Sequence, residues 1–341
     1  MPLVEQKQSR TLVGVVLILI FGALMCCGAT LVLGAVTGYD DAKKQASTPP
    51  PADDDTTDVP DDEIGDEDTS ATLKEQFADE MLAGLADAGH PDYVYDPDRY
   101  ELGVTDGGSR LLLGNLFDEY ARVEVDQREA FIERAVRSTF PADIPEDWAS
   151  AAPNLKLTVR DRVFLEMIRV RTPNAHMLSR PLGEELVELV AFDRPDAMSY
   201  VNDETAAKWG KSLDDVFAKA RQNLAADSTE RFTAVSPGVW ESPWSDNYDT
   251  GRAALFDVIR KLKVKGDPVL FLPQRDHLIV TGSDDARGLD AAIDLVDERL
   301  ALPRSNTGRG WRLTASGLVP WEPPAESRAW FLRKDATRND Y

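Results

Sequence analysis

An uncharged apolar run near the N-terminus limits the structures open to this chain more than any other segment does. Residues 11–39 read TLVGVVLILIFGALMCCGATLVLGAVTGY and contain no Asp, Glu, Lys or Arg. A helix that crosses a bilayer needs about 20 apolar residues, whereas the apolar core of a cleaved signal peptide has about 7–15. The run therefore predicts a single transmembrane helix over residues 12–38, after an N-terminal tail of residues 1–11.

The residues that flank this run do not fix its orientation by charge. Lys7 and Arg10 precede it, and Lys43 and Lys44 follow it, so the positive-inside rule gives a tie. The short N-terminal tail favours an uncleaved anchor in a cell membrane with the remaining domain on the extracytoplasmic side. The two cysteines of the chain, Cys26 and Cys27, both lie inside the run, and lipid attachment to one of them stays an alternative.

An acidic segment follows the apolar run. Residues 53–68 contain ten Asp or Glu and no Lys or Arg, within a chain of net charge −22. Such a segment buries too little apolar surface to offset its chain entropy, so we expect a disordered linker over residues 39–71. The acidic balance repels phosphate backbones, which argues against nucleic acid as a partner.

Folding signals begin at Thr72, which has capping-box spacing to Glu75. A pattern of two short strands and a helix then occurs three times, with hairpins at 100–114, 186–201 and 268–282. Asp-Gly in the first hairpin is a turn signal, and apolar residues recur at helical spacing after each hairpin. We expect an α+β domain over residues 72–333, a mainly antiparallel sheet built from hairpin-helix units with helices packed on it, and a frayed tail over residues 334–341.

Several segments, taken together in order, resemble a known family. They are AVRSTF (135–140), KLTVRDRVFLEMI (156–168), DNYDTGRAAL (246–255) and DPVLFLPQRDHLIVTG (267–282). The chain is similar to the YtpQ-like family of uncharacterised bacterial proteins over roughly residues 73–325. The resemblance implies a fold and no reaction. It also implies a soluble cytosolic protein, from which the apolar run and acidic linker of this chain depart.

The densest polar cluster lies in DNYDTGR, where Asp246, Tyr248, Asp249 and Arg252 precede helical sequence and Asp276 is a candidate neighbour from a hairpin turn. One interpretation is a carboxylate pair oriented by Arg252 for acid–base chemistry or for a divalent cation. The other, which we favour, is local. Asp249 caps the helix by accepting from the amides of residues 251 and 252, and Arg252 pairs with Asp249 or Asp246.

A second candidate feature is basic. If Arg137 and Arg160 converge, they form a site for an anion, although pairing with Glu133, Asp161 or Glu166 is the favoured alternative. The histidines lack metal-ligand spacing, and the nucleophile-elbow, phosphate-loop and dinucleotide motifs do not occur. We therefore assign no catalytic residue, no metal and no cofactor.

These observations favour a membrane-anchored protein that binds or scaffolds rather than catalyses. The expected partners are the lipid bilayer, through residues 12–38, and an unidentified protein or small molecule. The alternative is a hydrolase-type enzyme that uses the acidic cluster between Asp246 and Arg252.

Overall fold

The computed structural model describes residues 66–104, 110–140, 143–171, 176–195, 197–325, 328 and 330. The side chains of residues 66–69 and 171 are not described. From Gln76 onward the described residues belong to one compact unit, and residues 66–75 belong to another. The predicted tails (1–11 and 334–341), the predicted transmembrane helix (12–38) and the Asp-Gly turn near residue 106 lie outside the described residues.

The first part of the described chain combines helices with a small antiparallel sheet. Its strands lie in the order β1-β2-β3, and rings from three helices, Phe77, Phe117, Tyr120 and Phe131, pack together. The elements are α1 (Asp66–Asp87), β1 (Tyr93–Asp96), β2 (Glu101–Val104), β3 (Arg110–Leu112), α2 (Gly114–Tyr120), η1 (Val125–Gln127) and α3 (Arg128–Thr139).

A four-stranded antiparallel sheet follows, in which β6 pairs with β4, β5 and β7. Ser212 caps the helix α7, because its Oγ accepts from the amide of Asp215 at 3.1 Å. The elements are α4 (Trp148–Ala151), η2 (Ala152–Asn154), β4 (Leu155–Asp161), α5 (Arg162–Arg171), β5 (Ser179–Pro181), β6 (Leu186–Asp193), β7 (Met198–Tyr200), α6 (Asp203–Lys208) and α7 (Leu213–Asp227).

The last part forms a six-stranded antiparallel sheet in the order β13-β12-β10-β11-β9-β8. Asp285 caps α9 by accepting from the amide of Gly288 at 3.3 Å. The elements are β8 (Thr233–Ser236), β9 (Val239–Glu241), η3 (Asp249–Ala254), α8 (Phe256–Ile259), β10 (Pro268–Gln274), β11 (His277–Gly282), α9 (Ala286–Leu300), β12 (Gly310–Thr314) and β13 (Gly317–Pro320).

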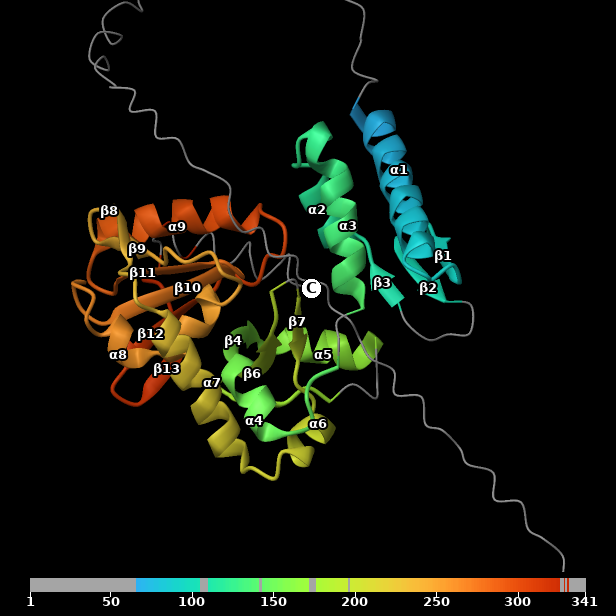
Figure 1. Ribbon diagram of the computed structural model, residues 1–341. Helices are drawn as coiled ribbons and strands as arrows, with labels where there is room; N and C mark the ends of the chain where they lie inside the picture. The colour runs from blue at the N-terminus through green and yellow to red at the C-terminus, as the bar shows by residue number, and fades with distance from the viewer. Residues whose placement is uncertain are drawn as a thin grey trace, which may run out of the picture. The chain divides into compact units, whose positions relative to one another are not determined.

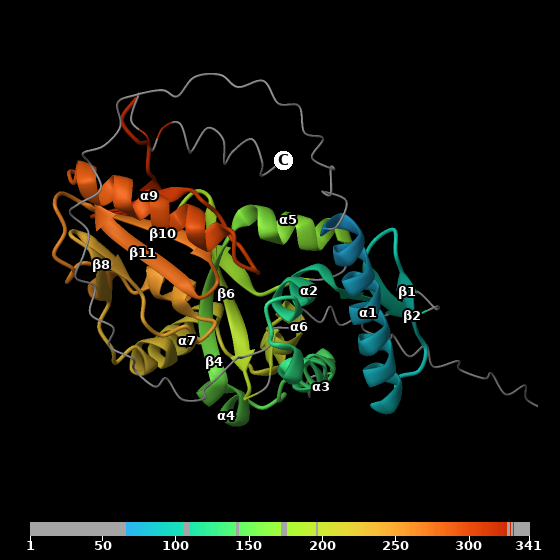
Figure 2. The same ribbon diagram turned by 90° about the horizontal axis from the view of Figure 1, so that it is seen from above.

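Helices cover the two larger sheets, and the main core lies between those sheets. The helix α9 packs on β9, β10 and β11, and α7 packs on β4 and β6 (Figures 1 and 2). Along β10 the side chains alternate, so Val269 and Phe271 face α9 while Leu270 and Leu272 join the main core. Because both faces of β10 are buried, its sequence is a continuous apolar run rather than an alternating one.

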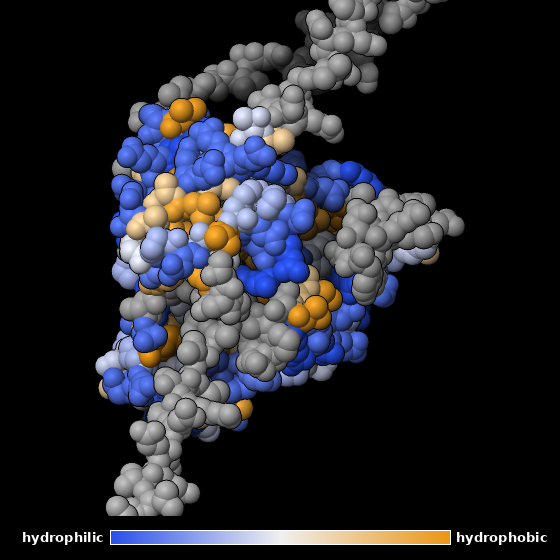
Figure 3. Space-filling model, turned by 90° about the vertical axis from the view of Figure 1, so that its right-hand side faces the viewer, coloured by the Kyte–Doolittle hydropathy of each residue, from blue (hydrophilic) through white to orange (hydrophobic). Residues whose placement is uncertain are grey.

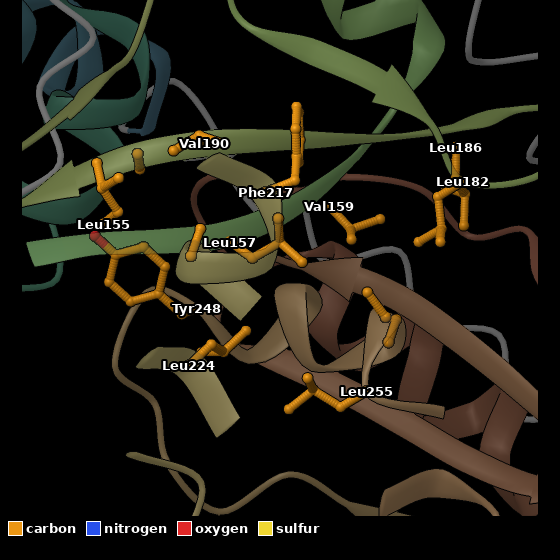
Figure 4. Packing of buried hydrophobic residues seen from close by; sticks show 14 of the residues in the cluster. Leu155, Leu157, Val159, Leu182, Leu186, Val190, Phe217, Leu224, Tyr248 and Leu255 are labelled. Carbon is orange, nitrogen blue, oxygen red and sulfur yellow. The ribbon is translucent and has the colours of Figure 1, made fainter. Parts of the chain in front are cut away.

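The main core draws on both larger sheets and on α7. Figure 4 shows Leu157 and Val190, from β4 and β6, with Phe217 of α7 and with Leu255, which follows η3. The predicted class, α+β with antiparallel hairpins and packed helices, is therefore confirmed. The three hairpin-helix units, however, fall in three separate sheets, because each unit finds its own partner strands.

One boundary also differs from the sequence-based expectation. The helix α1 begins at Asp66 rather than at Thr72, so the predicted linker of residues 39–71 ends earlier than expected. Acidic residues stabilise the first turn of a helix because they lie at the positive end of the helix dipole. This helix begins with Asp66-Glu67-Asp68. Among the described residues, none of the helices combines the length and the apolar character that crossing a bilayer requires.

Candidate functional site

The DNYDTGR segment lies between the two larger sheets. Its last four residues begin η3, which contacts β4 of one sheet and β10 and β11 of the other. All six residues of η3 are buried. Gly251 permits the close approach, because a Cβ at this position would lie 2.0 Å from the carbonyl oxygen of Leu157 on β4. The segment therefore fills the space between the two larger sheets.

The prediction that Asp249 caps an α-helix is wrong. The segment forms a six-residue 3₁₀ helix followed by the short α8, and the residue at the N-cap position is Tyr248, whose side chain makes no capping bond. Asp249 instead accepts from the amide of Asp246 at 3.2 Å. Ser245 and Asn247 have positive φ angles of 48° and 72°, which turn the chain sharply before η3 and leave Asp249 inside the first turn.

Arg252 meets the partner that its position in the sequence requires. Its Nη1 and Nη2 donate to Oδ1 and Oδ2 of Asp246, each at 2.7 Å, and its Nε donates to Oγ of Ser228 at 2.8 Å. The guanidinium also lies 4.0 Å from the ring centroid of Trp244. The Arg252 side chain is 0% exposed, whereas that of Asp246 is 34% exposed. The pair is therefore a two-bonded ion pair with only its carboxylate end in contact with water.

The two carboxylates beside Arg252 differ in their readiness to ionise. Burial opposes ionisation of Asp246, but the hydrogen bonds and the charge of Arg252 outweigh it and hold the pKa of Asp246 below its usual range. Asp249 is 0% exposed and lies 3.9 Å from Nη1 of Arg252. Burial, reinforced by the charges of Asp246 and Asp276, raises the pKa of Asp249 to about 6, against the opposing effects of Ser242 and Arg252.

Asp276 is a neighbour of this cluster, as the sequence predicts. Its Oδ1 accepts from the amide of Asn247 at 2.6 Å, and its Oδ2 accepts from Nη2 of Arg275 at 3.3 Å. It thereby ties the β10–β11 turn to the turn before η3. Tyr248 reaches a different neighbour, because its hydroxyl donates to Oδ1 of Asp193 on β6 at 2.9 Å.

The structure does not bring Arg137 and Arg160 together. Arg137 is exposed on α3, whereas Arg160 is buried on β4 and donates to Oγ1 of Thr250 at 3.2 Å. Arg275, which is buried as Arg160 and Arg304 are, lies close enough to both of them for their charges to act on it. Burial, together with the charges of Arg304 and Arg160, lowers the pKa of Arg275 to about 10. The predicted anion-holding pair is replaced by an internal arginine cluster.

The geometry of the cluster suits structural roles better than chemistry. Arg252 and Asp249 have no exposed surface, and the described residues contain no group of three His, Cys, Asp or Glu side chains placed to hold a metal ion. Sequence reasoning found Asp246, Asp249, Arg252 and Asp276 but missed Ser228 and Ser242. Ser228 directly follows α7, far from DNYDTGR in the chain, and Ser242 lies four residues before Asp246 without a capping or ligand spacing that marks it.

An open groove of about 850 Å³ lies elsewhere, between α1 and α3. Ala83, Gly84, Ile132 and Val136 supply its apolar lining. Gly84 brings the two helices close, since a Cβ there would lie 2.9 Å from Cγ2 of Val136. The polar lining includes four acidic and two basic side chains: Glu80, Asp87, Glu129, Glu133, Arg128 and Arg137. No local pattern in the sequence indicates this groove, because the groove depends on how two helices that are distant in the chain pack together.

Comparison with known protein families, with curated proteins and with solved structures finds no match to this chain.

Proposed function

We propose that this chain is a membrane-anchored binding protein, and that the groove between α1 and α3 takes a basic amphipathic helix of a partner protein. Residues 12–38 would hold the chain in the bilayer as a single-pass anchor, with the described domain on the extracytoplasmic side. The observation that carries the proposal is the groove itself, which combines an apolar floor with a mostly acidic rim.

The lining residues run along the groove at helical spacing. Those on α1 are Gln76, Glu80, Ala83, Gly84, Asp87 and Ala88. At about 1.5 Å per residue this stretch is about 18 Å long, which matches three turns of a bound helix. Amphipathic helices bind such grooves through apolar residues at spacings of three and four. The excess of carboxylates favours lysine and arginine on the polar side of the partner.

Photo-cross-linking from inside the groove tests this proposal in the native membrane. A photoreactive residue replaces Val125, which lines the groove and is exposed, and the matched control replaces Val235, an exposed residue on β8. The expected product joins position 125 to a basic amphipathic segment of another protein, identified by mass spectrometry of the cross-linked peptide. Cross-linking that is equal at positions 125 and 235, or that joins acidic segments, contradicts the proposal.

A hydrolase that uses the Asp246–Arg252 cluster is the second candidate. The observation in its favour is the raised pKa of Asp249, which places a carboxyl group that titrates near neutral pH beside a fixed arginine. Against it stands the complete burial of both side chains. Turnover of chromogenic ester and phosphate substrates that Asp249→Asn abolishes, while near-ultraviolet circular dichroism shows an intact fold, would favour the enzyme. Turnover that the variant retains would count against it.

The order of the four segments that resemble the YtpQ-like family supports placement of the chain in that family, which we retain as a proposal. The acidic surface supports the expectation that nucleic acid is not a partner.

A further inference from the structure

The helix α5 (Arg162–Arg171) carries apolar residues on two opposite sides. One side faces the four-stranded sheet, where Leu165 packs with Val187 and Leu189 of β6, and Ile168 is also buried. This inward side explains why the segment folds against the sheet. It leaves the opposite side of the helix to be explained.

The outward side of α5 carries a stripe of apolar residues. Val163, Met167 and Val170 are 42%, 47% and 82% exposed, and their spacing of four and three residues places them in one row along the helix. Single exposed apolar residues are ordinary on protein surfaces, and the other such residues of the described chain are scattered over several elements. On the face that Figure 3 shows, apolar residues likewise form small separate patches among hydrophilic ones. A continuous row on one short helix therefore stands out.

The charge of α5 is opposite to that of the chain. The helix contains three arginines and one glutamate, whereas the chain has a net charge of −22. Arg162 and Arg169 are exposed, and Glu166 pairs with Arg169 at 2.8 Å. Helical geometry puts Arg162 and Arg169 on one flank of the apolar row. Long arginine side chains beside an apolar row can reach lipid headgroups while the row enters the headgroup region.

We propose that the outward side of α5 is a lipid-contact surface that lies on an anionic bilayer. Charge complementarity selects this occupant, because an anionic surface attracts the arginines of α5 and repels the acidic remainder, so the domain would approach the bilayer with α5 foremost. A protein partner fits less well, since three short side chains offer a small area without a concave surface around them.

The anchor proposed above brings α5 within reach of the bilayer. Residues 39–65 separate the predicted span from the start of α1, and a chain extends at most about 3.5 Å per residue, which gives about 90 Å. The inference uses the anchor only for this proximity and does not depend on the groove. If the chain is not anchored, an alkaline wash releases it from vesicles. If the chain is anchored but α5 does not contact lipid, the wash leaves the chain in the vesicles, and only a probe attached to α5 reports the missing contact.

A local fluorescence measurement on the full chain in vesicles tests the lipid contact. With Cys26 and Cys27 replaced by serine, Val170→Cys carries an environment-sensitive dye, and Val235→Cys carries the same dye as the matched control. Vesicles contain either phosphatidylcholine alone or a mixture with phosphatidylserine. We expect a blue shift of the dye at position 170 in the anionic vesicles, quenched by lipid-borne nitroxides, and no shift at position 235.

Charge removal sharpens the test. Arg162→Gln and Arg169→Gln should each lower the ratio of docked to undocked α5 by about five-fold in anionic vesicles, with near-ultraviolet circular dichroism confirming an intact fold. Comparison of the two vesicle types needs neither substitution and tests the proposal even if these variants misfold. Equal emission at positions 170 and 235 in both vesicle types would overturn the lipid contact. A shift in neutral vesicles that grows with protein density would overturn it in favour of a protein partner.

Discussion

Replacing Arg252 with methionine removes the cation at the centre of the buried cluster while keeping most of its volume. The substitution deletes two charge-assisted hydrogen bonds to Asp246 and one hydrogen bond to Ser228. It also leaves Asp249 fully buried without its nearest cation. Loss of one partner of a buried ion pair costs about 3–5 kcal/mol. Because water reaches part of the Asp246 carboxylate, we expect a loss near 3 kcal/mol in the free energy of unfolding.

Urea denaturation of the full chain in detergent, followed by tryptophan fluorescence, measures this loss. In a domain of this size about 3 kcal/mol corresponds to a fall of roughly 6–12 °C in melting temperature. The loss should grow between pH 5 and pH 8, because Asp249 must ionise without Arg252 beside it. The matched control is Lys208→Met, which breaks the exposed pair of Lys208 with Glu146 and should leave the free energy of unfolding nearly unchanged. Equal stability of the Arg252→Met variant and the wild type would refute this account of the cluster.

Three further predictions concern other buried positions. Gly251→Ala should lower the free energy of unfolding by about 3 kcal/mol or more, because the new Cβ would meet the Leu157 carbonyl oxygen. The control is Gly114→Ala, whose Cβ meets nothing within 4 Å. This control should be neutral or stabilising in the same urea titration. Burial raises the pKa of Asp249 from 3.8 to about 6. The free energy of unfolding of the wild type, relative to that of Asp249→Asn, should therefore fall by up to about 3 kcal/mol as pH rises from 4 to 7. A difference that does not change with pH would contradict the burial argument. Burial opposes ionisation of Glu241, but hydrogen bonds from His277 and Arg299 outweigh this effect and lower the pKa of Glu241 to about 2. Glu241→Gln should therefore lower the free energy of unfolding by about 2–3 kcal/mol at pH 7 and by less at pH 3. Thermal melts of the variant and the wild type at the two pH values measure this difference.

The parts of the fold that depend on neighbouring residues could be predicted from the sequence. The hairpins expected at 186–201 and 268–282 form antiparallel pairs, and helices follow both of them along the chain. The assignment of hairpins to separate sheets could not be predicted, because it depends on contacts between distant strands. The same limit explains why DNYDTGR was interpreted as a helix start. Its 3₁₀ geometry follows from burial between two sheets, which no local pattern encodes.

The candidate site shows a similar division. The sequence predicts that Arg252 pairs with Asp249 or Asp246, and the structure shows its hydrogen bonds to Asp246. Asp276 was predicted as a neighbour and bonds to the turn before η3. Arg137 and Arg160 were paired only by residue type, and their elements place them apart. The groove between α1 and α3 had no sequence signal, because its lining combines two helices that are separated in the chain by the small sheet.

Binding of a basic helix by the groove is the central claim, and charge reversal on the groove rim tests it most directly. The probe is a fluorescent amphipathic leucine-lysine peptide, and the protein is the full chain in nanodiscs of phosphatidylcholine. Glu129→Arg with Glu133→Arg should weaken peptide binding about ten-fold in fluorescence anisotropy, since each rim charge contributes up to about 1 kcal/mol. Glu230→Arg, at an exposed position between α7 and β8, should leave the affinity unchanged. Equal affinity of the double variant and the wild type, or an equal loss in Glu230→Arg, would contradict the claim.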